Sequence, residues 1–304
     1  MLAKTSQNHG LIVVLIATLC AALVPILSKV VLLYITSPVT LSLRMGVAFV
    51  LLLAGMKLFL KERIHITKQS MLVALFGALN FAFFIFGINY IPTIFTPAFY
   101  SLVPIQTSLL GWLIFRNRIR PIKLLGIFIG LSGTWVILAE TFSLDVKAAE
   151  VHPLGILFML SASISIALYG LLIQNFKKLP SAYSVSLQAI GLALLFSVPA
   201  ILFTPDSLAL DQPINIWFWV GIVALASFGT VMQYVFYQNS IRILGTSATV
   251  IFFYLQPVFI VIISQLFLDE PLTWHYPIGM LLVLLGSSLN INFVLEKLRL
   301  ANTK

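Results

Sequence analysis

Two basic residues lie within strongly apolar stretches of this chain, where their charges need partners. Arg44 stands in the segment SPVTLSLRMGVAFVLLLAG, among leucine, methionine, valine and alanine. A guanidinium stays protonated in a protein, so it requires water, a counter-charge or carbonyl oxygens. Lys29 lies in the preceding apolar stretch, and neither stretch contains an acidic residue. An anionic group, such as a solute carboxylate, would supply the missing charge, and structural anchoring of the chain is the alternative.

The other candidates for binding chemistry are uncharged. Amides and hydroxyls within apolar stretches can orient the polar groups of a solute, and aromatic rings can shape its pocket. The predicted binding set is Asn80, Phe84, Tyr100, Ser165, Tyr169, Gln233, Tyr234, Phe253, Tyr254 and Gln256. The same groups can instead bond helix to helix, for about 0.6 kcal/mol each in a membrane.

Two prolines interrupt apolar stretches of the chain. Pro104 and Pro257 each remove a helical hydrogen bond and free a carbonyl four residues earlier. Irregular backbone at membrane depth survives where it faces protein or a water-filled cavity. The prolines therefore predict bent helices that gate a cavity, or else packing kinks.

Composition places these residues in a membrane. Of the 304 residues, 60% are hydrophobic and 9% charged, and the mean hydropathy is +1.07. Soluble domains carry about 25% charged residues, so this chain could not cover a water-facing surface. A span needs roughly 20 apolar residues. Ten spans are predicted: Leu11–Tyr34, Pro38–Leu60, Ser70–Ile91, Thr93–Phe115, Pro121–Glu140, His152–Gln174, Ala182–Phe203, Ile214–Asn239, Thr246–Leu268 and Leu272–Leu295.

Basic residues are distributed unevenly among the predicted loops. The N-terminus, the loops after the second, fourth, sixth and eighth spans, and the C-terminus hold 15 of the 18 Lys and Arg. Cytoplasmic loops collect Lys and Arg, which predicts a plasma (inner) membrane protein with both termini cytoplasmic. The net charge of +9 follows from this orientation, and no nucleic-acid partner is expected. Lys29 and Arg44 then lie near the outer ends of their spans, where long stems reach the interface, as a cationic pair at the outer mouth.

The chain also resembles itself at an offset of 153. Thr93–Pro104 aligns with Thr246–Pro257, Gly126 with Gly279, and Gly133 with Gly286; nearer the front, an offset of 144 aligns Arg44 with Gln188. Five spans per copy is an odd number, so the second copy is inverted. The predicted fold is an all-α integral membrane protein of ten transmembrane helices in two inverted five-helix repeats, 11–140 and 152–295. An external linker, 141–151, joins the repeats, and cytoplasmic segments 1–10 and 296–304 flank them. Inverted repeats are typical of secondary transporters, with the solute site near the midplane.

These motifs resemble a known family. The segment YLQPVFIVIISQLFLDEPLTWHYPIGMLLVLLG is similar to the proline-centred ninth helix, acidic loop and glycine-punctuated tenth helix of EamA-type transporters in the drug/metabolite transporter superfamily. Lys29, Pro38 and Arg44 fit the spacing of that family's Lys, Pro and Arg. The resemblance implies a transporter or exporter of a small organic solute, an amino acid or related metabolite. It also implies that helices 1, 3, 4, 6, 8 and 9 line a central cavity, with helices 5 and 10 packed behind.

Other chemistries find little support in the sequence. Cys20 is the only cysteine, and the histidines lie near predicted span ends, so no metal site is expected. No phosphate loop or nucleophile elbow is present, and no cofactor or enzymatic activity is expected. The lack of acidic residues inside the spans keeps a channel-like uniporter open, and a membrane-embedded enzyme of lipid chemistry is the other alternative. The segment Gly126–Gly133 predicts close helix packing, within a monomer or across a homodimer through helix 5 or 10. The expected partners are the solute and the lipid bilayer.

Overall fold

The structure is a computed structural model that describes residues 2–91, 96–119, 121–143, 152–203, 213–268, 274, 277–286 and 289. Most of the predicted linker 141–151, the segment 296–304 and much of the tenth predicted span lie outside these residues. Every regular element within the described ranges is helical.

Six helical stretches are long and apolar enough to cross a membrane. They comprise α1 (Leu2–Leu32), α2 (Ser37–Ala54) with the π-helical η1 (Gly55–Leu60), α3 (Lys68–Gly87), α7 (Pro153–Asn175), α8 (Ala182–Phe203), and α9 (Ile216–Ala226) continued by the π-helical η4 (Ser227–Met232) and α10 (Gln233–Leu244). These stretches confirm a multi-pass helical membrane protein.

The other described helices occupy the positions of the remaining predicted spans. They are α4 (Thr96–Ser101), α5 (Val103–Phe115), α6 (Pro121–Ser143), α11 (Thr246–Thr249), the 3₁₀ helix η5 (Val250–Tyr254), α12 (Leu255–Leu268) and a helix at Pro277–Gly286. The full count of ten spans stays a prediction, because these stretches are interrupted or only partly described.

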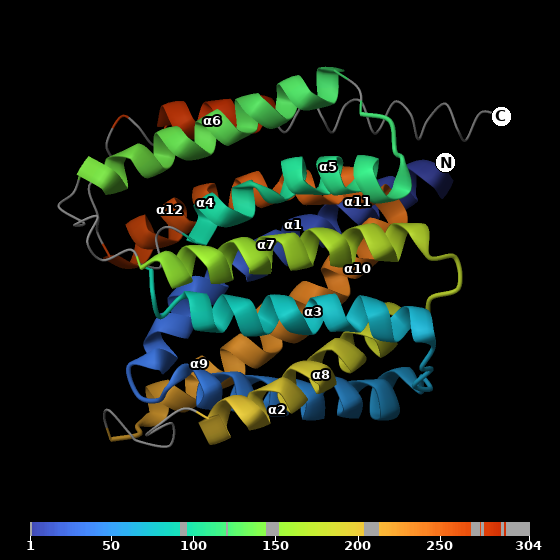
Figure 1. Ribbon diagram of the computed structural model, residues 1–304, viewed down its shortest axis with the longest axis vertical. Coiled ribbons are helices and arrows are strands. Elements are labelled where there is room, and N and C mark those ends of the chain that lie inside the picture. The colour runs from blue at the N-terminus through green and yellow to red at the C-terminus, as the bar shows by residue number, and fades with distance from the viewer. Residues whose placement is uncertain are drawn as a thin grey trace.

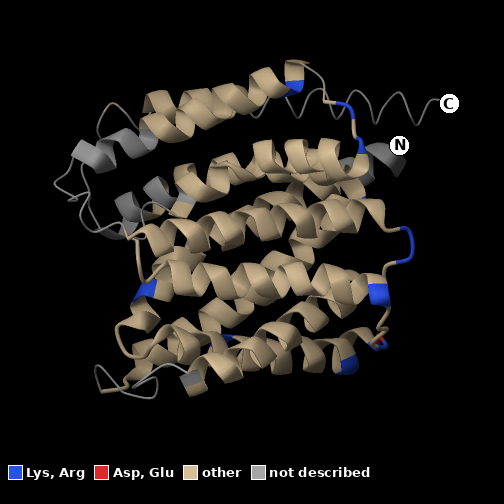
Figure 2. Ribbon diagram, in the orientation of Figure 1, with Lys and Arg blue, Asp and Glu red and all other residues tan. Residues whose placement is uncertain are grey.

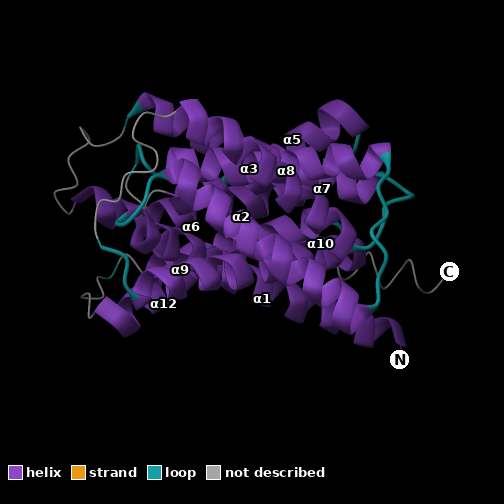
Figure 3. Ribbon diagram, turned by 90° about the horizontal axis from the view of Figure 1, so that it is seen from below, coloured by secondary structure: helices purple, strands orange, loops and turns teal. Residues whose placement is uncertain are grey.

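The helices lie side by side in a stack whose loops emerge at two opposite edges (Figures 1 and 3). Helices α2 and α8 pack together at one end of the stack, and α6 lies at the other. Between them, α3 contacts α7 and α8, while α1 contacts α10. Most of the described Lys and Arg gather at the loop edge where the N-terminus lies (Figure 2).

The outer surface between these edges is apolar. Phe59, Leu202 and Trp217 are 84%, 76% and 67% exposed. Large apolar side chains in such numbers would be unfavourable in water and suit contact with lipid. The bundle therefore buries its polar side chains and presents hydrocarbon outward, as a bilayer requires.

Local sequence explains where several helices begin. Thr67 caps α3 in a capping box, because its hydroxyl accepts from the Ser70 backbone N–H while the Ser70 hydroxyl accepts from the Thr67 N–H. Asn215 caps α9 by accepting from the backbone N–H groups of Trp217 and Phe218. Helix α10 ends at Gly245, whose φ of +84° favours glycine.

Glycines bring α6 against the helix at Pro277–Gly286. A Cβ on Gly133 would lie 2.6 Å from the Val283 backbone nitrogen and 2.7 Å from the Gly279 carbonyl oxygen. A Cβ on Gly286 would similarly lie 2.6 Å from the Gly126 carbonyl oxygen. The glycine-rich face of the fifth predicted span thus packs within the chain, backbone against backbone.

Candidate functional site

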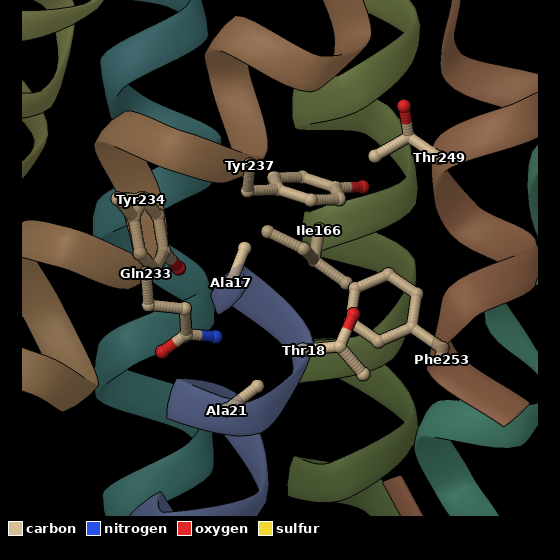
Figure 4. Close-up of a pocket in the computed structure, with 9 residues that line it drawn as sticks. All are labelled: Ala17, Thr18, Ala21, Ile166, Gln233, Tyr234, Tyr237, Thr249 and Phe253. Atoms are coloured by element: carbon tan, nitrogen blue, oxygen red, sulfur yellow. The ribbon is translucent and has the colours of Figure 1, made fainter. Parts of the chain in front are cut away.

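Two adjoining cavities lie in the interior of the bundle. The Arg44 cavity is lined by Ala21, Val24, Pro25, Arg44, Asn80, Phe81, Phe84, Thr96, Tyr100, Gln233, Tyr234 and Gln256. The Tyr237 cavity is lined by Ala17, Thr18, Ala21, Ile166, Gln233, Tyr234, Tyr237, Thr249 and Phe253 (Figure 4). They share Ala21, Gln233 and Tyr234, so the two cavities are neighbouring parts of one site.

The cavities are small in this conformation. Their volumes are about 30 Å³ for the Arg44 cavity and about 10 Å³ for the Tyr237 cavity. One water needs roughly 10–15 Å³ on this measure, so they hold a few waters at most. Solute pockets are typically several hundred cubic ångströms. A solute would therefore require the surrounding helices to separate.

Small side chains on α1 make room for these cavities. The small side chains of Ala17, Thr18 and Ala21 point toward the other lining residues, which include Gln233, Tyr237 and Phe253 (Figure 4). Positions one and four residues apart share one side of a helix, so this face of α1 lines the site, while Ile12 and Leu19 on α1 are exposed.

Arg44 is buried in the interior, with only 2% of its surface exposed. Its Nε donates to Thr230 Oγ1 at 2.9 Å and its Nη2 to the Gly229 carbonyl at 2.7 Å. The guanidinium carbon lies 5.6 Å from the centre of the Phe81 ring, a cation–π distance. The expectation that Arg44 reaches the outer interface beside Lys29 is wrong: Lys29 is exposed at the end of α1, and Arg44 faces inward.

The π-helical turn η4 supplies the acceptors for Arg44. The Thr230 hydroxyl donates to the Leu225 carbonyl, five residues back, at 3.0 Å. Gly229 lets this turn approach α1, because a Cβ there would lie 2.8 Å from Val24 Cγ2. π-Helical turns often mark functional sites, and here one presents a carbonyl and a hydroxyl to a buried cation.

Asn80 organises the polar wall of the Arg44 cavity. Its amide nitrogen donates to the Tyr100 hydroxyl and to the Ala162 carbonyl, both at 2.8 Å. Its amide oxygen accepts from the Tyr234 hydroxyl at 2.6 Å. The rings of Tyr234 and Phe81 lie 4.1 Å apart. This network connects α3, α4, α7 and α10, the helices that surround the site.

Seven of the ten predicted binding residues line the cavities. They are Asn80, Phe84, Tyr100, Gln233, Tyr234, Phe253 and Gln256. Their contact with a solute stays a prediction, whereas their convergence from distant parts of the chain is a structural observation.

The other three lie outside the cavity walls. Ser165 donates to the Ser161 carbonyl on its own helix at 2.7 Å. Tyr169 is buried behind Tyr234, with ring centres 5.5 Å apart. Tyr254 points toward α6, where its hydroxyl donates to the Ile127 carbonyl at 3.1 Å. Each of the three thus contacts neighbouring protein groups, and its part in solute binding stays a prediction.

Both predicted prolines adjoin breaks in their helices. Pro104 is the second residue of α5, directly after the turn at Leu102 that separates α5 from α4. Pro257 is the third residue of α12, which follows the 3₁₀ helix η5. Each proline thus begins a new regular segment next to the cavities, and its role as a gate stays a prediction.

The repeat offset of 153 identifies cavity-lining residues that were not in the predicted binding set. Five pairs of lining residues are separated by 153 positions: Asn80 and Gln233, Phe81 and Tyr234, Phe84 and Tyr237, Thr96 and Thr249, and Tyr100 and Phe253. Four of these lining residues were not in the predicted binding set: Phe81, Thr96, Tyr237 and Thr249. Phe81 and Tyr237 are the offset partners of predicted binding residues, and Thr96 and Thr249 are partners of each other. The first member of every pair lines the Arg44 cavity, and the second lines the Tyr237 cavity.

Fold and site together define a multi-pass membrane protein with a small, partly polar site in its core. Residues 8–139 and 153–292 each match the EamA-like transporter family. The chain belongs to this family of membrane transporters, which confirms the resemblance seen in its motifs.

Several curated relatives are transporters of Bacillus subtilis (strain 168). The uncharacterized transporter YyaM is 27% identical over 71% of this chain and 69% of its own length. The uncharacterized transporter YetK is 27% identical over 82% and 77%. A protein of known crystal structure shares the fold, with a TM-score of 0.72 at 17% identity, over 96% of this chain and 98% of the other.

Proposed function

We propose that the protein is a secondary transporter that moves a small organic solute, an amino acid or related metabolite, by alternating access. The observation that carries this proposal is the pair of small interior cavities, whose walls are built from residues related by the repeat offset. Sites between inverted repeats are characteristic of secondary transporters. The solute class rests on the family resemblance.

Reciprocal contacts support the proposed pair of inverted repeats. Gly133 meets Gly279, and the offset of 153 converts this contact into the one between Gly286 and Gly126. A self-complementary interface of this kind is expected from two-fold symmetry.

The aromatic residues repeat this reciprocity inside the site. Phe84 and Tyr100 have ring centres 6.1 Å apart, and their offset partners Tyr237 and Phe253 are 5.5 Å apart. Tyr100 itself lies 6.1 Å from its own partner Phe253. A pair that contacts its own equivalent belongs near the symmetry axis, which argues for a solute site there.

The broken helices suggest how the site opens. The segments before Pro104 and Pro257 are offset equivalents, and each joins a regular helix through an irregular turn. Exchange of their two conformations would open the cavities to one side and then to the other. A free-energy difference of a few kcal/mol between the states is enough for a solute to shift the balance.

The proposed mechanism also includes an orientation of the protein in the membrane. The basic loop edge is assigned to the cytoplasm of a plasma (inner) membrane, following the distribution of Lys and Arg. Both termini then lie inside.

Comparative metabolite profiling of medium and cytosol, with and without expression, identifies the solute, and counterflow in proteoliposomes tests the mechanism. Gln233→Ala, at the junction of both cavities, should reduce counterflow, whereas Phe59→Ala on the 84% exposed outer surface should not. Uptake without counterflow would indicate a channel, and chemical conversion of the solute without a gradient would indicate an enzyme.

A further inference from the structure

The hydrogen bonds of Arg44 leave much of its guanidinium available. The group has five N–H donors in a planar fork. Two of them are used within the described part of the chain, by Thr230 and by the Gly229 carbonyl. Both acceptors are uncharged, so the positive charge of this buried side chain has no neutralising partner among them.

No carboxylate lines either cavity among the residues that the structure describes. Glu62 is the one acidic residue whose side chain is described, and it follows η1 in the loop before α3, where it accepts from the Ser181 hydroxyl at 2.6 Å. A buried cation without a paired anion is costly. An anion beside the guanidinium would relieve that cost, and the described lining residues supply none.

The charge also breaks the symmetry of the site. Arg44 aligns with Gln188 at the offset of 144. Gln188 lies outside both cavities, where its amide bonds the Ser70 hydroxyl and the His65 carbonyl. The cation therefore marks one half of an otherwise matched pair of cavities, and gives the site a polarity along which a solute can align.

We propose that the transported solute carries a carboxylate that binds the free side of the Arg44 guanidinium, an inference that rests on the proposed transport function. The planar fork matches a carboxylate with two parallel hydrogen bonds. Tyr100 and Gln256 line the same cavity, where the Tyr100 hydroxyl and the Gln256 amide can supply neighbouring donors. The rest of the solute extends past Gln233 toward the buried Tyr237 hydroxyl, which has no hydrogen-bond partner among the described residues.

Matched acids and amides test this inference. Full-length protein in detergent is heated with each of a panel of L-amino acids and short 2-hydroxy and 2-oxo acids, and with the corresponding carboxamides at equal ionic strength. Wild-type protein should be stabilised by at least one acid, with an apparent affinity at least about tenfold above that of its amide.

Three variants locate the effect. Arg44→Gln should lose the preference for acid over amide. Arg44→Lys keeps the charge without the planar fork, so it should retain a reduced preference and remains informative if Arg44→Gln does not fold. Lys57→Gln, which removes an exposed cation from η1, should bind like wild type.

The possible outcomes separate this inference from the proposed function. Stabilisation by no acid in the panel, equal binding of acid and amide, or an unchanged preference in Arg44→Gln or Arg44→Lys would overturn it. Binding is measured without transport, so acid binding without counterflow would refute only the transport function. Counterflow with no preference for acids would refute only the role of Arg44.

Discussion

Two neighbouring tyrosines on α10 should respond in opposite ways to loss of the hydroxyl. Tyr234 donates to the Asn80 amide oxygen at 2.6 Å, whereas the buried Tyr237 hydroxyl has no hydrogen-bond partner among the described residues. Both side chains are nearly inaccessible, at 1% and 6% exposure, so Phe substitution changes the polar group at little cost in packing. We expect Tyr234→Phe to destabilise the protein and Tyr237→Phe to leave its stability unchanged or raised.

The magnitudes follow from what each change leaves behind. Tyr234→Phe removes one hydrogen bond and leaves the Asn80 amide oxygen buried without its donor, for about 1–2 kcal/mol. The Asn80 amide nitrogen keeps its bonds to Tyr100 and Ala162, so the loss should not spread further. Tyr237→Phe removes an unsatisfied buried hydroxyl, which should return up to about 1 kcal/mol.

Thermal unfolding of both variants in the same detergent measures the difference directly. Tyr234→Phe should unfold at a lower temperature than wild type, and Tyr237→Phe at an equal or higher one. Counterflow adds a second readout, because Tyr237→Phe should transport more slowly if its hydroxyl meets the solute. Equal destabilisation by the two substitutions would refute the assignment of the hydrogen bond to Tyr234 and of the unpaired hydroxyl to Tyr237.

Two further predictions concern packing and topology. Gly133→Ala should lower stability by about 1–3 kcal/mol in thermal unfolding, because its methyl would meet backbone atoms. Gly46→Ala, with open space around it, should be neutral or stabilising. Equal effects of the two substitutions would refute the close contact between α6 and the helix at Pro277–Gly286. In a Cys20→Ala background, Asp145→Cys should react with an impermeant maleimide added outside cells and Ile64→Cys should not, and the reverse pattern would invert the proposed orientation.

Much of the architecture could be predicted because hydropathy and repetition are properties of the chain itself. Six helices of spanning length and the glycine contact of α6 follow from apolar runs and from spacing. The depth of Arg44 could not be predicted in this way. Its acceptors come from the π-helical turn η4, and no residue type in that segment signals a π turn before folding.

The candidate site, too, could be predicted from the sequence only in part. Phe253 and Tyr254 are adjacent aromatic residues in one stretch, yet Phe253 lines a cavity and Tyr254 contacts α6. Consecutive helical residues point in directions roughly 100° apart, and the 3₁₀ turns of η5 alter that angle. Composition therefore identified the segment, and only tertiary packing decided which ring faces inward. The Ser165 hydroxyl bonds to its own helix, a local contact that residue type alone does not reveal, and its part in solute binding stays a prediction.

The buried guanidinium has an electrical consequence for the bilayer. Arg44 is the one charged side chain among the described residues that line the cavities. A unit charge that crosses the full membrane potential exchanges about 2.3 kcal/mol per 100 mV. Any rearrangement that moves this cation, or the water that reaches it, through part of the hydrocarbon is therefore driven or opposed by voltage. A bound monoanion would cancel the charge, so voltage would act mainly on the solute-free protein. The membrane potential would then set the rate at which the empty site returns to the side where it binds solute.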